Sequence, residues 1–369
     1  MSRIALAMLA AALLLSGAPY FAVAQQAPTA EEKPKAYANY EELFEDFQKS
    51  RNVLLTRYER LREKERIEPA ELEAVENEMR ALDRQYAAAL RAYIDGHADA
   101  KDVMSARFEL AVTWSRLPDS LDRAIATADE FLEKHPDSEL VADARFLKAQ
   151  TLFQIAGRES DCVAAIEAFI EKHADRAEIP AVRVMRVRAL LFLDRVDDAK
   201  RSLKVLLDSS DVKKDEEARE FLQAQLDNLG WIGRELPDFD LPMVGGGKAS
   251  RADFAGKPLI LIVYDSTSSA CLGELPFIQQ AHKKFGEKLG IFGISVNESR
   301  TAFEQWLERN KEKIAFKNAW IDREAENTLT RKLDVSLIPF NVLVNGDGKI
   351  YRYDVRSDDM LRYAELLAK

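Results

Sequence analysis

The chain has 369 residues, of which 47% are hydrophobic and 31% are charged, and its formal net charge is −10. This length predicts two or three domains, and the composition is typical of a globular protein and excludes a chain that is disordered throughout. Because acidic residues outnumber basic ones and no basic stripe with interleaved aromatic residues occurs, we expect no nucleic-acid partner.

Residues 1–24 have the pattern of a secretory signal peptide. A single cation, Arg3, precedes the apolar stretch Ile4–Leu15, and small residues occupy both cleavage-specifying positions of Ala22-Val23-Ala24. The alternative is a retained membrane anchor, although the apolar stretch is shorter than the roughly 20 residues of a spanning helix. No cysteine follows it, so we expect no lipoprotein anchor, and residues 25–36 are typical of a flexible lead-in. The sequence therefore predicts a periplasmic or otherwise exported protein with no membrane span after signal cleavage.

Residues 37–98 predict an antiparallel helical hairpin with highly charged outer faces. Apolar residues recur at helical spacing from Tyr37 to Tyr93. Pro69 interrupts this pattern, because proline is tolerated in the first turn of a helix but not inside it. A dimerising coiled coil is the alternative, but the pattern lacks a sustained heptad, and the sequence leaves the oligomeric state open.

Residues 99–229 contain an internal repeat with a spacing of 38 residues. Phe131-Leu-Glu-Lys-His135 recurs as Phe169-Ile-Glu-Lys-His173, and a weaker third copy lies around Leu203–Leu207. Each copy predicts a pair of helices, and the pairs stack because one pair cannot bury its apolar face alone. The predicted pairs are 103–114 with 121–134, 140–155 with 162–172, and 181–193 with 196–207. This arrangement resembles a tetratricopeptide-type array, which implies a concave face for a protein or peptide partner of the cell envelope; a simple spacer is the alternative.

Two histidines and one cysteine stand out in the repeat region. His135 and His173 hold equivalent places at helix ends, where histidine can cap carbonyl groups and complement the helix dipole, so we expect no metal site there. Cys162 lies on the apolar stripe of its helix and is expected to be a buried small hydrophobe. Because an exported chain with two cysteines often pairs them, a disulfide between Cys162 and Cys271 is the alternative.

After Gly230 the pattern changes from helical to alternating strands and helices. The apolar run Leu259–Tyr264 predicts a central strand that is buried on both faces. Further strands are predicted at 291–296, 318–321, 340–344 and 349–353, and helices at 273–285, 300–310, 324–333 and 360–367. A turn at Asn345–Gly348 joins the last two strands as an antiparallel hairpin. Parallel strands with helical crossovers, ended by a hairpin, predict a three-layer α/β sandwich.

Residues 233–369 also carry short motifs in an order that resembles a known family. The motifs are Gly233-Arg-Glu-Leu-Pro237-Asp-Phe239, Asp253-Phe254-Ala-Gly256-Lys257-Pro258, Glu274-Leu-Pro276, Ile338-Pro339-Phe340 and Gly346-Asp-Gly348-Lys-Ile350. They resemble the exported TlpA/ResA-like thiol-disulfide oxidoreductases and their peroxiredoxin (AhpC/TSA-related) relatives. The predicted fold is therefore multidomain: an all-α hairpin and helical-repeat array, followed by a three-layer α/β thioredoxin fold.

In this family a Cys-x-x-Cys pair stands three residues before the Glu-Leu-Pro motif, whereas the matching segment here is Ser268-Ser269-Ala270-Cys271. The resemblance assigns the second, resolving cysteine to Cys271 and places Ser268 where the first, nucleophilic cysteine stands. A serine hydroxyl supplies neither an attacking thiolate nor a resolving thiol. We therefore expect the usual disulfide reductase activity to be absent.

Two alternatives keep chemistry at Cys271. Peroxiredoxins carry Thr-x-x-Cys with the reactive cysteine second, so Ser268 could take the threonine's role while the start of the helix lowers the pKa of the thiol. Against this, Tyr264 stands where that family has proline, and the sequence identifies no partner arginine. The other alternative is thiol-disulfide exchange completed by a cysteine from elsewhere, such as Cys162 or another chain.

Pro339 matches the cis-proline that faces the active-site cysteines of thioredoxin folds, where an extended peptide binds by strand-like hydrogen bonds. Together with Ile338 it forms the candidate peptide-binding site, and this surface needs no cysteine. Alternatively, Pro339 is kept only because the turn requires it. The sequence favours a binding or scaffold role over one-cysteine chemistry, and it predicts no cofactor and no metal.

Overall fold

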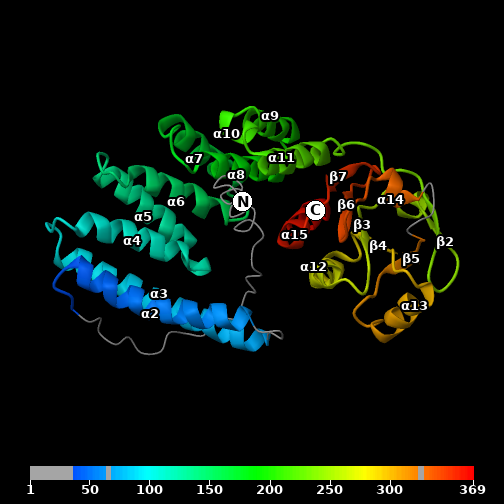
Figure 1. The fold of residues 1–369 in the computed structure, drawn as a ribbon, viewed down its shortest axis with the longest axis horizontal. Coiled ribbons are helices and arrows are strands. Elements are labelled where there is room, and N and C mark those ends of the chain that lie inside the picture. Colours follow the sequence, from blue (N-terminus) through cyan, green and yellow to red (C-terminus); the bar gives the residue numbers. More distant parts are fainter. Residues whose placement is uncertain (1–35, 64–67, 323–327) are drawn as a thin grey trace. The chain divides into compact units, whose positions relative to one another are not determined.

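The structure is a computed structural model that describes residues 36–63, 68–322 and 328–369 (Figure 1). The predicted signal peptide, residues 1–24, lies outside the described residues. The described residues form two compact units, residues 36–195 and Val196–Lys369. The boundary between them lies inside the region 99–229 that the sequence predicts as repeats.

The first unit begins with the predicted hairpin, formed by α2 (Tyr40–Arg62) and α3 (Pro69–Gly96), which pack against each other. The Asn39 side chain caps α2 by accepting a hydrogen bond from the backbone N–H of Glu42 at 2.8 Å. Pro69 stands in the first turn of α3, where its missing N–H costs no helical hydrogen bond. The break predicted at this proline is confirmed.

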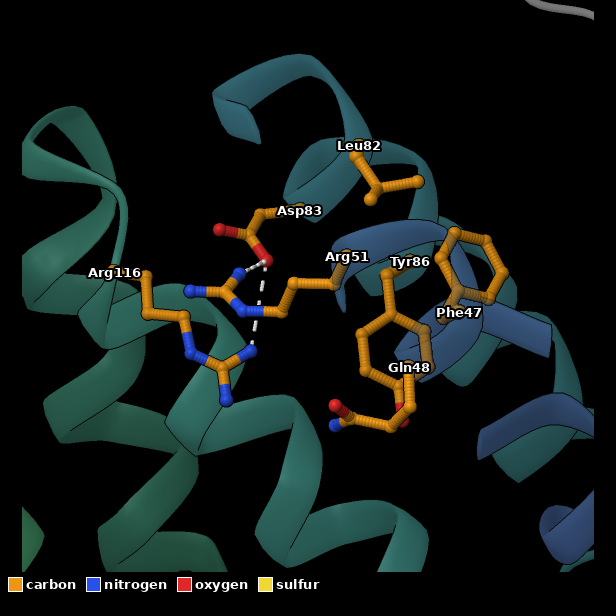
Figure 2. Close-up of a pocket in the computed structure, with 7 residues that line it drawn as sticks. All are labelled: Phe47, Gln48, Arg51, Leu82, Asp83, Tyr86 and Arg116. Carbon is orange, nitrogen blue, oxygen red and sulfur yellow. Dashed lines mark hydrogen bonds and ion pairs between the residues drawn. The ribbon is translucent and has the colours of Figure 1, made fainter. Parts of the chain in front are cut away.

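A largely buried ion-pair cluster joins the hairpin to the first repeat (Figure 2). Asp83 of α3 lies 2.5 Å from Nη1 of Arg51 on α2 and 3.5 Å from Nη1 of Arg116, which follows α4. Beside it, Phe47 of α2 stacks on Tyr86 of α3 with ring centroids 4.5 Å apart. The Asp83 carboxylate therefore pairs with one arginine of the hairpin and one arginine of the first repeat.

The repeats consist of alternating helices that pack on their neighbours in sequence. Their bounds are α4 Val103–Ser115, α5 Leu121–Lys134, α6 Val141–Phe153, α7 Glu159–Lys172 and α8 Ile179–Phe192, with the short η1 Pro118–Ser120 before α5. The first helices of successive repeats also pack together, α4 on α6 and α6 on α8. The predicted stacking of helix pairs is confirmed for the first two copies. The third predicted pair is divided, because the boundary between the units falls between α8 and α9 (Val196–Leu207).

The structure repeats the sequence motif in three dimensions. The rings of Phe131 and Phe169 each pack against a phenylalanine of the preceding helix, with ring centroids 5.8 Å apart. Each also packs against the histidine four residues later, with ring centroids 5.3 Å apart. His135 and His173 are the C-caps of α5 and α7, and their backbone N–H groups cap the helices. Burial, followed by the nearby arginines, lowers the pKa of both imidazoles. A lowered pKa favours the neutral ring, so the expected complement to the helix dipole is weakened.

The second unit holds a five-stranded sheet in the order β5-β4-β3-β6-β7. β3, β4 and β5 are parallel, β6 is antiparallel to β3, and β7 is antiparallel to β6. The strand bounds are β3 Leu259–Tyr264, β4 Gly290–Ser295, β5 Lys317–Trp320, β6 Phe340–Val344 and β7 Ile350–Tyr353. A separate hairpin pairs β1 (Asp240–Pro242) with β2 (Lys248–Ser250), and the short η2 (Arg251–Phe254) follows. The sheet with its helices confirms the predicted α/β architecture.

Helices precede the sheet and connect its strands. Their bounds are α9 Val196–Leu207, α10 Ser210–Lys213, α11 Glu216–Leu229, α12 Ser269–Phe285, α13 Arg300–Arg309, α14 Leu329–Lys332 and α15 Ser357–Leu367. The segment after α11 is tied to the sheet, since Trp231 stacks on Tyr353 of β7 and the N–H of Gly233 donates to the carbonyl of Ile350 at 2.8 Å. Part of the helix predicted at 324–333 lies outside the described residues.

Three predicted helix starts were wrong by three or four residues. α12 begins at Ser269 rather than residue 273, because the Ser268 side chain caps the helix by accepting a hydrogen bond from the N–H of Cys271. α15 begins at Ser357 rather than residue 360, and α7 begins at Glu159 rather than residue 162. The first correction matters most, because it moves Cys271 from a loop into the first turn of a helix of 17 residues.

Candidate functional site

The predicted site residues converge at one end of the five-stranded sheet. In the strand register Tyr264 is paired with Ser295, and Val263 with Phe340. The segments that follow β3 and β4 and the segment that precedes β6 therefore meet at this edge. They carry Ser268 and Cys271, then Asn297, then Ile338 and Pro339. The Ile338–Pro339 peptide bond is cis, as the resemblance implies.

Cys271 is enclosed by its own helix start and by the end of β3. Its side chain is only 1% exposed. Its sulfur accepts a hydrogen bond from the backbone N–H of Asp265 at 3.5 Å. The hydroxyl oxygen of Ser268 accepts from the backbone N–H of Cys271 at 3.4 Å. The two predicted catalytic residues are thus linked through the backbone, and the serine oxygen serves as a helix cap.

The other cysteine of the chain lies in the first unit. Cys162, on α7, is fully buried, and its thiol donates to the carbonyl of Ala149 at 3.6 Å. Burial raises the pKa of this thiol to about 12. Both cysteines are free thiols, so the structure contains no bridge between them. The prediction that Cys162 is a buried small hydrophobe is confirmed.

Asn297 organises the loop that precedes Cys271. Its side-chain oxygen accepts from the N–H of Ser266 at 3.1 Å and from the hydroxyl of Ser295 at 2.8 Å. Its amide nitrogen donates to Asp265 Oδ1 at 2.8 Å and to the Ser266 hydroxyl at 2.9 Å. Asp265 also accepts from the N–H and the hydroxyl of Thr267, closing an Asx turn. The buried side-chain amide of Asn297 therefore fixes the loop whose backbone N–H bonds to the sulfur of Cys271.

Tyr264 borders the thiol from the end of β3. Its hydroxyl donates to Asn318 Oδ1 at 2.8 Å. Burial, with a smaller contribution from Cys271, raises the pKa of this phenol. The residue that replaces the family's proline is therefore a neutral, hydrogen-bonded core side chain.

The cis-proline segment is held by α15 and its preceding turn. The Arg356 guanidinium donates to the carbonyl of Pro339 and pairs with Asp354 at 2.6 Å. Burial raises the pKa of the Asp354 carboxyl. Glu274, in the Glu-Leu-Pro motif of α12, accepts from the N–H and hydroxyl of Ser357 at 2.8 and 2.9 Å. These contacts join the helix that carries Cys271 to the segment after β7.

Two exposed leucines adjoin the site residues in the sequence. Leu337, directly before Ile338, is 77% exposed, and Leu272, directly after Cys271, is 40% exposed. Ile338 and Pro339 are themselves partly exposed. At this edge of the sheet, apolar side chains are open to solvent while the sulfur is not.

Sequence reasoning missed Asn297 and Ser357. Asn297 follows directly after a buried parallel strand, and the carboxyl ends of parallel strands are where functional side chains gather in α/β folds. That signal was available. The pairing of Ser357 with Glu274 spans 83 residues and had no local signal.

The described residues contain no group of three or more His, Cys, Asp or Glu side chains that could hold a metal ion. Over the same residues, no helix has both the length and the apolar character that crossing a bilayer requires.

Comparisons with known proteins concern the second unit. Residues 232–364 match the model of the AhpC/TSA family. The chain is 26% identical over 120 residues to the thiol-disulfide oxidoreductase ResA of Bacillus thuringiensis subsp. konkukian, covering 32% of this chain and 66% of that protein. It is 25% identical over 124 residues to the thiol:disulfide interchange protein DsbE of Xylella fastidiosa, covering 33% of this chain and 60% of that protein. The match to this chain thus spans less than two thirds of the length of each of these curated relatives.

Two solved structures show the same kind of similarity. One is the thioredoxin domain of a thiol-disulfide oxidoreductase from Bacteroides vulgatus, with 20% identity, a TM-score of 0.35, and coverage of 37% of this chain and 98% of that one. The other is StoA from Bacillus subtilis, with 18% identity, a TM-score of 0.30, and coverage of 35% and 97%. Together with the family model and the curated relatives, the sheet topology confirms the predicted thioredoxin-like domain.

Proposed function

Because residues 232–364 form a thioredoxin-like domain related to thiol-disulfide oxidoreductases, we propose that this chain is a binding or scaffold protein that retains the fold without its dithiol cycle. The binding surface is the Leu337–Pro339 segment together with the exposed start of α12. Its ligand is an extended, apolar segment of another protein.

The observation that carries the proposal is the contrast in exposure at this edge of the sheet. Cys271 is 1% exposed, whereas Leu337 is 77% exposed. A sulfur that attacks a disulfide must reach its substrate as a thiolate, and a second thiol must then release the mixed disulfide. Position 268 offers only a hydroxyl, which caps the helix. Covering an exposed leucine with an apolar partner, by contrast, lowers the free energy of the complex.

The redox half of the proposal is tested by insulin reduction with dithiothreitol as the electron source. We expect no turnover above that of the reductant alone. Turnover catalysed by the wild-type protein would overturn the proposal. A Cys271→Ala variant controls for contamination, because genuine catalysis at this site disappears with its only sulfur.

The binding half is tested with a reduced and carboxymethylated polypeptide, which is unfolded and carries no thiol. We expect Leu337→Asp to weaken binding of this probe by about tenfold, since it removes the buried area of one leucine and adds a charge. The matched control is Leu366→Asp, a leucine of α15 that is 37% exposed. Equal affinities of the wild type and both variants would place binding elsewhere.

A second candidate function is favoured by the polar contacts of the thiol. The sulfur lies in the first turn of α12, at the positive end of the helix dipole, and accepts the N–H of Asp265. In this alternative the Cys271 thiolate attacks one oxygen of a peroxide and becomes a sulfenic acid, while the O–O bond breaks and the leaving oxygen takes a proton from solvent to form an alcohol or water. Mass spectrometry after treatment with hydrogen peroxide distinguishes the two. Our proposal predicts an unmodified Cys271 in the folded protein, whereas rapid gain of one oxygen supports the alternative.

Export is part of the same proposal. We propose that residues 1–24 are removed on passage through the inner membrane, so that the mature chain begins at Gln25 in the periplasm. N-terminal sequencing of protein from a periplasmic extract tests this. Recovery of the chain in the membrane fraction with Met1 or Ser2 at its start would contradict it.

A further inference from the structure

The helical unit contains a hollow of about 560 Å³, formed by the end of α3 and by α4 and α5. This volume falls in the range of sites that bind ligands. The hollow lies entirely within the first unit and shares no residue with the Leu337–Pro339 segment. A ligand here would therefore bind independently of the proposed function.

The floor of the hollow is apolar. Each helix contributes to it: Ile94 from α3, Leu110 and Trp114 from α4, and Phe131 from α5. These side chains are between 1% and 8% exposed, so the floor belongs to the core of the unit. The Arg123 guanidinium lies over the Trp114 ring, 5.2 Å from its centroid. An apolar ligand group that enters the hollow therefore meets an apolar floor in which a cation already lies over the Trp114 ring.

The rim is basic, although the chain as a whole has a net charge of −10. Four cations surround the hollow, Arg91, Arg107, Arg123 and Lys134, together with only two carboxylates, Asp95 and Glu130. Glu130 is already shared by two of the cations, at 2.9 Å from Arg107 Nη1 and 2.6 Å from Lys134 Nζ.

Two of the rim cations keep their charge for a ligand. Across residues 36–63, 68–322 and 328–369, Arg91 and Arg123 form no ion pair, and both are exposed. An excess of exposed positive charge around an apolar floor complements an anionic group attached to an apolar one.

The charge pattern continues along the array, which favours an extended ligand. Arg107 recurs at the repeat spacing as Arg145 on α6 and Arg183 on α8. Because α4 packs on α6 and α6 on α8, these equivalent arginines lie on neighbouring helices. A compact anion would contact only the hollow, whereas an extended chain can continue onto α6 and α8, which carry the half-buried Arg145 and Arg183.

We propose that this hollow binds an acidic peptide segment whose one large apolar side chain, aromatic or aliphatic, packs on the apolar floor. Carboxylates on either side of that side chain pair with Arg91 and Arg123. A nucleic acid fits less well, because Asp95 and Glu130 stand on the rim and repel a continuous phosphate backbone.

The test uses the full chain and fluorescein-labelled nine-residue peptides, with fluorescence anisotropy as the readout. The probe has glutamate and aspartate residues around a central phenylalanine. One comparison peptide replaces the phenylalanine by serine, and another replaces the acidic residues by lysine. We expect binding of the first peptide only, with an affinity that falls as salt increases because the rim charges are exposed.

The variant Arg91→Gln with Arg123→Gln removes the two rim charges that form no ion pair among the described residues, and also the cation that lies over Trp114. We expect it to bind the acidic phenylalanine peptide about tenfold more weakly, the combined effect of two exposed charge pairs. The matched control is Arg60→Gln, an exposed arginine of α2 outside the hollow. Far-UV circular dichroism and the melting temperature confirm that each variant is folded.

Three results would overturn the proposal. One is equal affinity for the acidic and the lysine peptides, and another is unchanged binding by the double variant. The third is full competition by millimolar succinate or by a single-stranded RNA of similar length, which would assign the hollow to a small anion or to nucleic acid. None of these results bears on the insulin assay or on Leu337, so the two proposals fail separately.

Discussion

The buried amide of Asn297 offers the sharpest test of how the fold protects Cys271. Asn297 is 4% exposed and makes four side-chain hydrogen bonds, all to Ser295 or to the loop that begins at Asp265. Replacing it with alanine removes all four and leaves the backbone bonds of residue 297 in place. These include the bond from Trp320 Nε1 to its carbonyl at 2.7 Å.

The cost follows from which partners are left without a substitute. Each hydrogen bond contributes about 1 kcal/mol, and a buried group left unsatisfied costs about 1–3 kcal/mol. The N–H of Ser266 is buried and loses its acceptor, whereas the half-buried Asp265 carboxylate can bind water instead. We therefore expect Asn297→Ala to destabilise the loop by about 2–3 kcal/mol.

The loop holds the sulfur through the N–H of Asp265, so the same change should open access to Cys271. If alkylation requires the loop to open, 2–3 kcal/mol raises the open population, and hence the alkylation rate, by about 30-fold to 150-fold. The assay is reaction with iodoacetamide under native conditions, with peptide mass mapping to separate Cys271 from Cys162. The control is Asn345→Ala, which loses two side-chain hydrogen bonds in the turn between β6 and β7. Loss of stability in Asn297→Ala without faster alkylation of Cys271 would refute the reasoning.

Three other changes test the remaining parts of the structure. Asp83→Ala should destabilise the helical unit by about 2–3 kcal/mol in urea unfolding. This is below the cost of breaking a fully buried pair, because Arg51 and Arg116 can rehydrate. Asp119→Ala, in an exposed pair, should cost under about 1 kcal/mol, and equal losses in the two variants would contradict the expectation. Ser268→Cys should give measurable insulin reduction, because it restores the missing thiol. Ser268→Ala should give none, and it should lower the free energy of unfolding by about 1 kcal/mol because the helix cap is lost. A Ser268→Cys variant that folds normally but is inactive would show that the site lacks more than the thiol. Because the folded pKa values of His135 and His173 are lowered, their contribution to stability is present above the unfolded pKa and is lost as the pH falls through the folded values. The double His→Gln variant should therefore lose less melting temperature than the wild type between pH 7 and pH 5, and identical losses would contradict this.

The spacing of apolar residues correctly predicted those helices and strands that bury either one face or both faces along their whole length. The run Leu259–Tyr264 matches β3 residue for residue, because a strand buried on both faces needs a continuous apolar stretch. α5 and α9 also match their predicted ranges, since each has one apolar stripe at helical spacing. The start of α12 was missed because the capping serine was assigned to chemistry and not to the helix.

The site could be predicted only in part, for a different reason. The motif order located Ser268, Cys271, Ile338 and Pro339 in sequence, and the strand register brings their segments together. Exposure, however, depends on long-range packing. No local pattern distinguishes a thiol at 1% exposure from one open to solvent, and none foretells that Leu337, near the end of a connecting loop, stays uncovered.

Burial and charge together give the two proposed binding surfaces opposite preferences. The surface at Leu337 and Leu272 is apolar and lies beside a thiol that is closed off, so it can select extended apolar segments without forming a covalent bond. The hollow of the helical unit places uncommitted arginines around an apolar floor, so it can select acidic segments. A partner that carried both kinds of segment would bind far more tightly than either segment alone, provided that the linker between them spans the two sites. A peptide that joins the acidic phenylalanine sequence to an apolar strand through flexible linkers of increasing length tests this. Affinity should rise sharply at one linker length and then decline, whereas affinity that is independent of linker length would mean that the surfaces act separately.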